Sequence, residues 1–553
     1  MVGIVKISII ISLTTVLAGP ALGQQLPSAG GQLRQLPPAP PPAPSTLRDQ
    51  RPRLPRETPA DVSTGPSFRV NALHISGVSV FPEIVLIGVT GFAPGTAVTL
   101  GQLRQMAARI TDYYAGHGYF VAQAYFPPQA LAEGVVTIAV IEGHYGAVTL
   151  KNGSRVSNAA AKRILSGLNR GDIVTDAPLE RRLLLLSDLP GTRIRSTIAP
   201  GTEVGTSDLT IDIERGRGIT GSIDADNAGN RYTGYYRLGG SVNFNNPLGI
   251  GDVVTLTGLV SDGGLTYVRS SYQAPVGALT LGVAYARLDY RLRREFEALH
   301  AHGSADIASV YASDPIIRSH NRNVFLLAAV NFNAYRDDVD ATASTSVKHS
   351  RTGSLGLSGD ARSRRGSIFW SVTGTYGDLD IRTSAVRVID DATAHANGSF
   401  FKGNLSAGGV AAVTRNLSLY FAGRGQLASK NLDISEKMEL GGAYGVRAYP
   451  EGEAFGDQGY VVTAEARLMV AHDLPGDLSL VAFVDNGGVT FNRNRFSAAP
   501  NTTNLSGIGG GVTWAQNGNF QIKASYARRL GSTRVVSGPD DSGQFWLQAT
   551  KLF

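Results

Sequence analysis

The most informative property of this 553-residue chain is what it lacks. It contains no cysteine, which excludes disulfide bonds and thiolate metal sites and fits export to an oxidising compartment. Charged residues make up only 17 %, fewer than in an ordinary soluble protein, and 66 glycines are too many for a helical one. After the N-terminus, no stretch approaches the roughly 18 to 20 apolar residues of a membrane helix. A membrane protein of this kind has to be a closed β-barrel, because the bilayer leaves no backbone group free to bond with water.

Sequence signals for chemistry are missing as well. The net charge of +7 is spread thinly and forms no basic block with interleaved aromatic residues, so nucleic-acid binding is not supported. There is no G-x-S-x-G motif, and no histidine lies near a plausible nucleophile. His300 and His302 form an H-x-H pair in a polar loop, but without a third ligand the pair indicates a solvated loop. We therefore expect no enzyme activity, no cofactor and no metal.

The N-terminal segment has the features of an export signal. Lys6 precedes an apolar run over 7–18, and Ala21-Leu22-Gly23 has small residues at the positions that a signal peptidase reads. The alternative is a membrane anchor, for which a run of about 12 residues is short. We expect a signal peptide at 1–23, followed by a proline-rich N-terminal segment or linker at 24–65.

Two similar small units are expected next, at 66–143 and 144–217. The first begins with FRVNALHISG, in which apolar and polar residues alternate as in a half-buried strand. Thr99 is a helix N-cap before LGQLRQMAARITDYYAGHG, and two strand candidates follow. In the second unit Ser157 and Asp176 are expected to cap two helices that lie between strands. The order of elements predicts two tandem α+β domains.

Residues 218–553 have the pattern of a transmembrane β-barrel. Alternating strands of about ten residues are joined by short turns and longer polar loops in turn, and no helix is expected. A soluble sandwich or propeller is disfavoured, because neither a blade repeat nor a dense polar outer face is present. The closing segment FWLQATKLF places apolar residues on one face, which Lys551 interrupts.

Taken in order, these segments resemble the TpsB transporters of two-partner secretion, also called haemolysin or haemagglutinin secretion/activation proteins. GYFVAQAYFPPQ…GVVTIAVIEG is similar to the end of a POTRA domain in that family, and NNPLGIGD and YQAPVGA are similar to its first barrel turns. LGGAYGVRAYPEGEAFGDQG resembles its sixth extracellular loop, and FVDNGG resembles the strand that the loop meets. The resemblance implies two α+β POTRA domains and an antiparallel barrel of sixteen strands, with the loop near 441–459 folded inward.

The functional prediction depends on this loop. In the family, the arginine of a V/I-R-G-Y/F tetrad meets the aspartate of an F-x-D-x-G motif on the barrel wall. The matching residues here are Val446, Arg447, Ala448 and Tyr449 in the loop, and Phe483, Asp485 and Gly487 on the strand. Physical reasoning supports the pair, because an arginine inside a narrow barrel needs a carboxylate and an aspartate facing lipid would be unfavourable. Ala448 replaces the usual glycine, which leaves the conformation of the loop tip open.

The resemblance implies a pore in the bacterial outer membrane with its POTRA domains in the periplasm. Such a protein recognises an unfolded partner there, a large TpsA-type exoprotein such as an adhesin or haemolysin, and secretes it to the cell surface or medium. The barrel is expected to be monomeric in outer-membrane lipid. Two alternatives stay open, namely a barrel-assembly protein of the same superfamily and a passive porin.

In this family an N-terminal helix can also plug the barrel. In QQLPSAGGQLRQL, Pro27 and the adjacent Gly30 and Gly31 make a poor helix. We therefore expect any plug to be short or marginal, and deletion of 24–45 to change pore conductance little.

Overall fold

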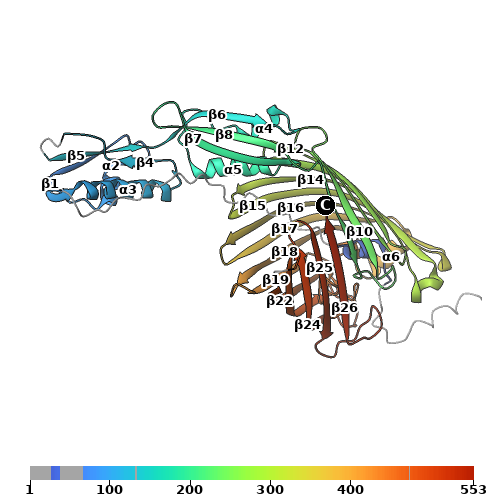
Figure 1. Cartoon of the computed structure of the whole chain (residues 1–553). Coiled ribbons are helices and arrows are strands. Elements are labelled where there is room, and N and C mark those ends of the chain that lie inside the picture. Colours follow the sequence, from blue (N-terminus) through green and yellow to red (C-terminus); the bar gives the residue numbers. More distant parts are fainter. Residues whose placement is uncertain (1–25, 38–65, 131–133, 472–473) are drawn as a thin grey trace, which may run out of the picture.

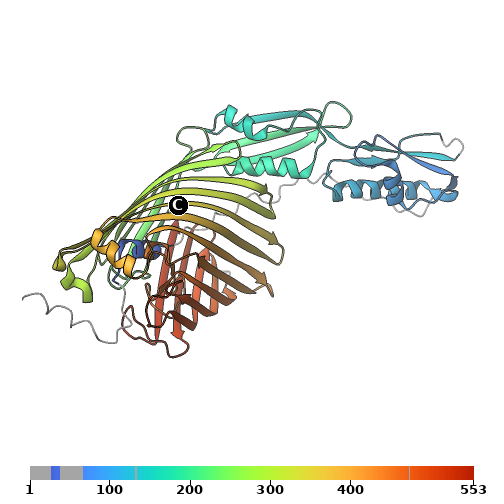
Figure 2. The same cartoon turned by 180° about the vertical axis from the view of Figure 1, so that it is seen from behind.

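The computed structural model describes residues 26–37, 66–130, 134–471 and 474–553. Two small α+β units lie in a row and lead to a large β-barrel (Figures 1 and 2). The expected signal peptide and most of the expected proline-rich segment lie outside the described residues. Among the described helices, none has the length and apolar character needed to cross a membrane.

The first α+β unit has two small sheets and two helices. Its elements are β1 (Ser67–Val70), β2 (Ala72–Ser76), α2 (Glu83–Thr90), β3 (Thr96–Thr99), α3 (Leu100–Gly116), β4 (Gln123–Tyr125) and β5 (Val135–Ile141). Helix α3 begins where expected, because the Thr99 hydroxyl accepts from the backbone N–H of Gln102 while the Gln102 side chain accepts from that of Thr99. Helix α2 was not expected. Its sequence is apolar nearly throughout, so it lacks the helical period that would reveal it.

The second α+β unit repeats the plan with a single sheet. It contains β6 (His144–Asn152), α4 (Asn158–Leu165), α5 (Asp176–Ser187), β7 (Thr192–Pro200) and β8 (Thr206–Arg215), in the sheet order β6-β8-β7. Ser157 caps α4 as expected. The expectation that Asp176 caps the next helix is wrong, because Thr175 is the N-cap and Asp176 is the first helical residue. A carboxylate in the first turn still interacts favourably with the helix dipole.

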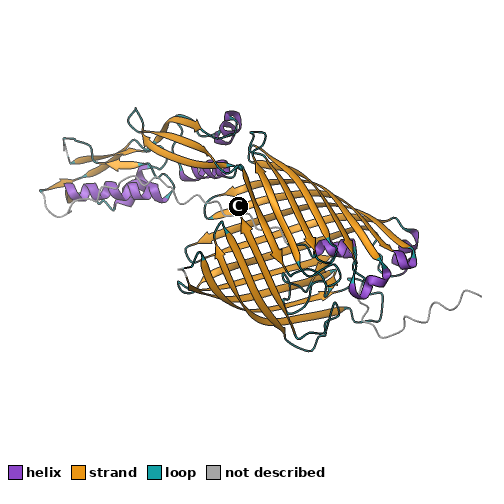
Figure 3. Cartoon of the chain, turned by 45° about the vertical axis from the view of Figure 1, so that its right-hand side comes forward, coloured by secondary structure: helices purple, strands orange, loops and turns teal. Residues whose placement is uncertain are grey.

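The barrel is closed and antiparallel, and its ring of sixteen strands is completed by pairing of β26 with β9 (Figure 3). Its strands are β9 (Ile219–Asp226), β10 (Arg237–Asn245), β11 (Val253–Ser261), β12 (Thr266–Val276), β13 (Leu279–Arg291), β14 (Ala301–Arg318), β15 (Arg322–Val339), β16 (Ser344–Ser363), β17 (Gly366–Ile381), β18 (Gly398–Ala412), β19 (Leu417–Ala428), β22 (Gln458–Ala471), β23 (Asp477–Thr490), β24 (Thr502–Gln516), β25 (Phe520–Arg529) and β26 (Gly543–Leu552). The strand number and the fold class agree with the expectation.

Side-chain alternation gives the barrel an apolar outer surface. Val283 on β13 and Phe332 on β15 are about half exposed on the outside, at 52 % and 51 %, whereas Tyr290 and Tyr335 on the same strands are buried in the lumen. An outward band of this kind faces lipid in a membrane barrel. The interruption by Lys551 is explained by its position, because its ammonium group donates to the side chain of Asn519 in the turn between β24 and β25. A lysine at such a border can extend its charge toward water.

The loops of the barrel contain short helical segments, so the expectation of none is wrong. Helix α6 (Ser384–Ala392) lies between β17 and β18, and 3-10 turns occur at η1 (Arg294–Leu299), η2 (Asp340–Thr342) and η3 (Ile434–Glu436). The Asp390 carboxylate accepts the backbone N–H groups of Ala396 and Asn397, which closes the loop after α6. In a nine-residue helix this local bonding carries more weight than sequence periodicity.

A short helix, α1 (Ala29–Arg34), lies inside the barrel against β13, β14 and β15 and is drawn in blue in Figure 2. Its first backbone N–H donates to Asp337 Oδ1 at 2.7 Å. The glycines that make the segment a poor isolated helix allow it to fit here, because a Cβ on Gly30 would lie 2.7 Å from the Cβ of Ser435. The helix is short, as expected, and its position is set by packing against the barrel strands and against η3.

Candidate functional site

The loop between β19 and β22 folds into the lumen. It contains η3, β20 (Met438–Glu439) and β21 (Phe455–Gly456). Its apolar residues are buried against the inner wall in one cluster, which contains Met438, Leu440, Val446, Ala448, Tyr449 and Ala454 from the loop and Val461, Phe483, Val489, Leu505, Ala527 and Val535 from the strands and the following loop. Burial of these side chains explains why the loop turns inward instead of extending into water.

Arg447 lies at the tip of this loop and binds Asp485 with a two-pronged contact. Its Nε donates to Asp485 Oδ2 at 2.8 Å and its Nη2 donates to Oδ1 at 2.7 Å. The backbone N–H of Arg447 also donates to Oδ2, at 3.2 Å. Asp485 is fully buried, so it faces the lumen and not lipid. The parallel fork explains the choice of arginine, since lysine cannot form two aligned bonds to one carboxylate.

A second carboxylate, which sequence reasoning missed, completes the contact. Arg447 Nη1 donates to Glu465 Oε1 on β22 at 2.8 Å, and the other oxygen of Glu465 accepts from Arg467 at 2.6 Å. The Thr463 hydroxyl donates to Asp485 at 2.9 Å. Two arginines and two carboxylates therefore balance in charge. The available signal was the sequence TAEAR, where alternation places Thr463, Glu465 and Arg467 on one face of a membrane strand.

Phe483 and Gly487 shape the wall on either side of Asp485. The guanidinium carbon of Arg447 lies 3.5 Å from the centre of the Phe483 ring, a distance at which the ring face attracts a cation. Gly487 provides room for the loop, since a Cβ at this position would lie 2.5 Å from Leu440 Cδ1. Each residue of the F-x-D-x-G motif therefore contacts the loop or leaves space for it.

Ala448 fits the loop tip with a backbone conformation that any residue adopts. It is not among the non-glycine residues with positive φ, so the missing glycine costs no left-handed strain. Its methyl group faces Gly507 on β24, where an added Cβ would lie 2.5 Å from the Ala448 Cβ. The absence of a side chain at Gly507 therefore leaves the space that the Ala448 methyl group occupies.

Further contacts tie the loop to the last strand and the last loop. Trp546 on β26 donates its indole N–H to the backbone carbonyl of Arg447 at 2.7 Å. Glu453 accepts from the backbone N–H groups of Val536 and Ser537 at 3.0 and 3.1 Å, and from the Ser537 hydroxyl at 2.6 Å. Tyr449 is fully buried and donates to the carbonyl of Thr533. We call the loop tip and these partners the latch.

The loop also holds helix α1. Arg34 donates to Glu436 of η3 at 3.1 Å, and Lys402 on β18 lies 2.6 Å from the same carboxylate. Lys348 on β16 forms a 2.6 Å ion pair with Asp433 in the same segment. The plug, the inner loop and the wall are thus one connected assembly inside the lumen. This assembly occupies the lumen of the barrel.

A closed sixteen-stranded barrel, preceded by two α+β units and holding a latched loop in its lumen, defines an outer-membrane transporter with POTRA domains. A family model described as haemolysin secretion/activation protein ShlB/FhaC/HecB matches residues 205–514, and a model of the ShlB-type POTRA domain matches 68–143. The chain belongs to the haemolysin secretion/activation family, whose members are TpsB transporters of two-partner secretion. It is an outer-membrane secretion pore, with its POTRA domains in the periplasm.

Individual proteins of this kind match along most of their length. The chain is 27 % identical over 469 residues to the heme/hemopexin transporter protein HuxB of Haemophilus influenzae strain 86-028NP, covering 83 % of this chain and 82 % of that protein. It is 24 % identical over 498 residues to the outer membrane transporter CdiB of Dickeya dadantii strain 3937, covering 88 % and 85 %. Among solved structures, CdiB from Escherichia coli has a TM-score of 0.70 at 20 % identity and covers 92 % of this chain and 94 % of that one, which shows the shared fold.

Proposed function

We propose that this chain secretes one large exoprotein of the TpsA type, which it binds unfolded in the periplasm and passes through its lumen as an extended chain. The observation that carries the proposal is the occupied lumen, in which helix α1 and the loop latched by Arg447 obstruct the barrel. A gated lumen suits a conduit that opens for one client. The names of HuxB and of the hemolysin transporter protein HpmB of Proteus mirabilis support a secreted partner.

Recognition is proposed to occur on the POTRA domains, with limits at 66–143 and 144–217, ahead of a barrel domain at 218–553. Their sheets have edge strands that pair on one side only, and an extended segment can add to such an edge through backbone hydrogen bonds. This mode of binding demands little of the client's sequence. Limited proteolysis tests the proposed limits, because cleavage should concentrate between the domains.

The alternatives receive less support. The structure of BamA from Haemophilus ducreyi lacking POTRA domains 1-3 has a TM-score of 0.52 at 13 % identity, which is a likeness of fold alone. Assembly proteins typically carry more POTRA domains than the two proposed here, and a passive porin needs none. We further propose that the barrel works as a monomer in outer-membrane lipid and catalyses no reaction, so purified protein should show no esterase or protease activity.

Secretion of a candidate partner tests the proposal. The chain is expressed in a bacterial outer membrane together with the exoprotein encoded beside its gene, and the exoprotein is measured in the medium and on the cell surface. We expect release that depends on this chain and is lost in Arg447→Ala, although that barrel still inserts. Continued retention of the exoprotein in the periplasm, with rescue of a strain depleted of its own barrel-assembly protein, would instead support the assembly function.

A further inference from the structure

Two glutamates meet at the neck of the inner loop. Glu439 on β20 precedes the loop tip, and Glu451 follows it. Both side chains are buried, since the two residues are only 7 % and 4 % exposed. Their carboxyl groups are hydrogen-bonded to each other. Two ionised carboxylates have no hydrogen to donate, so a bond of this kind requires that one of the two is protonated.

Each glutamate also binds the backbone of the opposite arm of the loop. Glu439 accepts from the backbone N–H of Gly452 at 2.6 Å, and Glu451 accepts from that of Ala443 at 2.9 Å. The carboxyl group of Glu451 lies directly against Gly442, where an added Cβ would overlap it. The pair therefore joins the two arms of the loop on either side of its tip.

Two arginines on the barrel wall interact with the pair. Arg424 on β19 donates to the backbone carbonyl of Glu439 at 3.2 Å and attracts both carboxyl groups. Arg237 on β10 attracts both as well, but its Nε already donates to Asp226 on β9 at 2.8 Å. Tyr444 of the loop also interacts with the pair, and its hydroxyl is uncharged at neutral pH. One of the two arginines is thus already occupied by another carboxylate.

The charges around the neck balance when one proton is held there. Arg237 and Arg424 supply two positive charges. Asp226, Glu439 and Glu451 would supply three negative charges if all of them were ionised. A buried carboxylate without a cation of its own is costly. One protonated carboxyl group removes the excess charge and provides the donor for the bond between the two glutamates.

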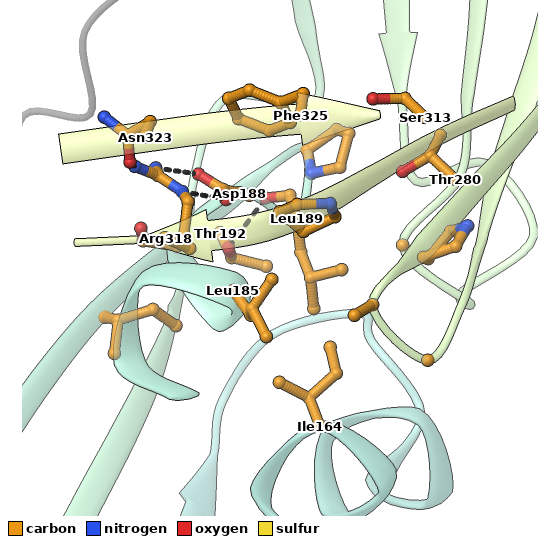
Figure 4. Close-up of a pocket in the computed structure, with 18 of the residues that line it drawn as sticks. Ile164, Leu185, Asp188, Leu189, Thr192, Thr280, Ser313, Arg318, Asn323 and Phe325 are labelled. Carbon is orange, nitrogen blue, oxygen red and sulfur yellow. Dashed lines mark hydrogen bonds and ion pairs between the residues drawn. The ribbon is translucent and has the colours of Figure 1, made fainter. Parts of the chain in front are cut away.

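Other carboxylates of the chain have a cation as their partner. Asp188 at the end of α5 accepts two bonds from Arg318, at 2.6 and 2.8 Å (Figure 4). Asp433 in the inner loop forms a 2.6 Å ion pair with Lys348. In the described part of the chain, the hydrogen-bond partners of the Glu451 carboxyl group are a backbone N–H and another carboxyl group. A proton therefore takes the place that a cation has at the other sites.

The pH at which this proton is lost follows from its surroundings. Burial raises the pKa of Glu451 well above its ordinary range, and the neighbouring Glu439 carboxylate raises it further. The contribution of the proton to the closed loop is present in full below the ordinary glutamate pKa of about 4.3. It is lost as the pH rises through the raised pKa, because two negative charges then lie side by side.

We propose that Glu439 and Glu451 share one buried proton that closes the neck of the inner loop, and that its removal at alkaline pH loosens the loop and the latch. The inference goes beyond the proposed secretion function and can be measured without a client. Arg237 also donates to the backbone carbonyl of Gln35, the C-cap of α1, at 2.9 Å. Movement of this arginine toward the new negative charge would loosen the plug as well.

Conductance of the purified barrel in a planar bilayer tests the proposal. From neutral to alkaline pH, the wild-type conductance should rise several-fold. Glu451→Gln should stay at its neutral-pH conductance throughout, because an amide keeps the hydrogen-bond donor and removes the charge. Glu439→Gln should lose the rise as well, since a single ionised carboxylate remains at the neck. Insertion of each variant is checked by the heat-dependent mobility of the folded barrel on gels.

Glu453→Gln is the matched control. Glu453 is a buried carboxylate of the same loop, but it binds the N–H groups of Val536 and Ser537 and not a second carboxyl group. The substitution weakens the latch and should raise the starting conductance, yet the rise with pH should remain. A rise that disappears in Glu453→Gln and persists in Glu451→Gln would overturn the proposal. A wild-type conductance that is independent of pH would overturn it too.

Infrared spectroscopy detects the proton directly, because a protonated carboxyl group has a carbonyl stretch that a carboxylate lacks. Difference spectra of the wild-type barrel between neutral and alkaline pH should show the loss of such a band, and Glu451→Gln should lack this change. If Glu451→Gln does not insert, Glu439→Gln serves for both measurements. A difference band that is unaltered in the inserted variants would assign the proton to another group and contradict the proposal.

Discussion

The two sides of the lumen differ in chemistry although they belong to one continuous sheet. On β22, β23 and β25, the inward-facing Glu465, Arg467, Asp485 and Lys523 form a charged wall, and the latch binds there. On the opposite side of the ring, half-way round from β25, lies β15 with its neighbours β13, β14, β16, β17 and β18. The inward-facing residues there are the even-numbered ones on β13, β16 and β18 and the odd-numbered ones on β14, β15 and β17, and all of them within 280–286, 309–313, 325–333, 350–358, 371–375 and 404–408 are uncharged. We call this surface the neutral wall. Paired charges in a dry site hold one geometry, whereas hydroxyl and amide groups tolerate many. The comparison indicates that the charged wall anchors the latch, whereas the neutral wall offers no charged partner that would fix a neighbouring segment.

Arg447→Ala should have the largest effect. Its loss leaves the buried Asp485 without its cation, which costs roughly 3 to 5 kcal/mol in local stability. We expect the latch to open and secretion to collapse while the barrel still inserts. Asp485→Ala should act in the same pathway, so the double variant should be no worse than the more severe single one. Additive losses in the secretion assay would show that the two residues do not act as a unit.

Gly507→Ala should weaken the latch by steric overlap. The added methyl would lie 2.5 Å from the Cβ of Ala448, and overpacking of this kind typically costs about 1 to 3 kcal/mol. Ala448→Gly in the same chain should restore secretion. Gly258→Ala is the matched control, because no atom lies within 4 Å of its added Cβ. If Ala448→Gly fails to rescue, the two residues do not share this space in the working protein.

Deletion of residues 26–37 should raise conductance in a planar bilayer. This differs from the expectation drawn from the sequence, because helix α1 bonds to Asp337 on β15 and to Glu436 in the loop and so obstructs the lumen. Asp337→Ala should raise conductance less, since it removes one bond and keeps the helix. Conductance unchanged by the deletion would mean that the remaining loop closes the pore alone.

Glu465→Gln should have a smaller effect than loss of Asp485. The amide oxygen can still accept from Arg447, while the two-pronged bond to Asp485 remains. We expect a cost of roughly 1 to 2 kcal/mol, as for a hydrogen bond that loses its charge, and a partial fall in secretion. A loss as complete as that of Arg447→Ala would place Glu465 at the centre of the latch.

Ser371→Ala should have the smallest effect of all. The hydroxyl bonds to Ser406 on the neutral wall, where neighbouring polar groups can replace it. Secretion and heat-dependent gel mobility should both match the wild type. A marked fall would show that the neutral wall depends on fixed hydrogen bonds, and the contrast with the charged wall would weaken.

The sequence predicted the architecture because each barrel strand carries its own alternation, and it led to Arg447 and Asp485 through their motifs. Glu465 was missed although alternation places it inward, since one strand does not reveal which loop lies against it. Intrinsic propensity predicts that the segment of α1 is a poor helix, whereas its packing against Ser435 stabilises the helix in the folded protein. The fit of Ala448 depends on Gly507, 59 positions along the chain, and no local pattern connects the two.

The bond from Trp546 to the carbonyl of Arg447 has a consequence for assembly. Trp546 lies on β26, the strand that closes the ring by pairing with β9. The loop therefore depends on the closing strand for this bond, and its other contacts to the wall come from strands and loops that precede β26 in the sequence. A barrel without β26 would lack both the seam of its wall and one bond of the latch.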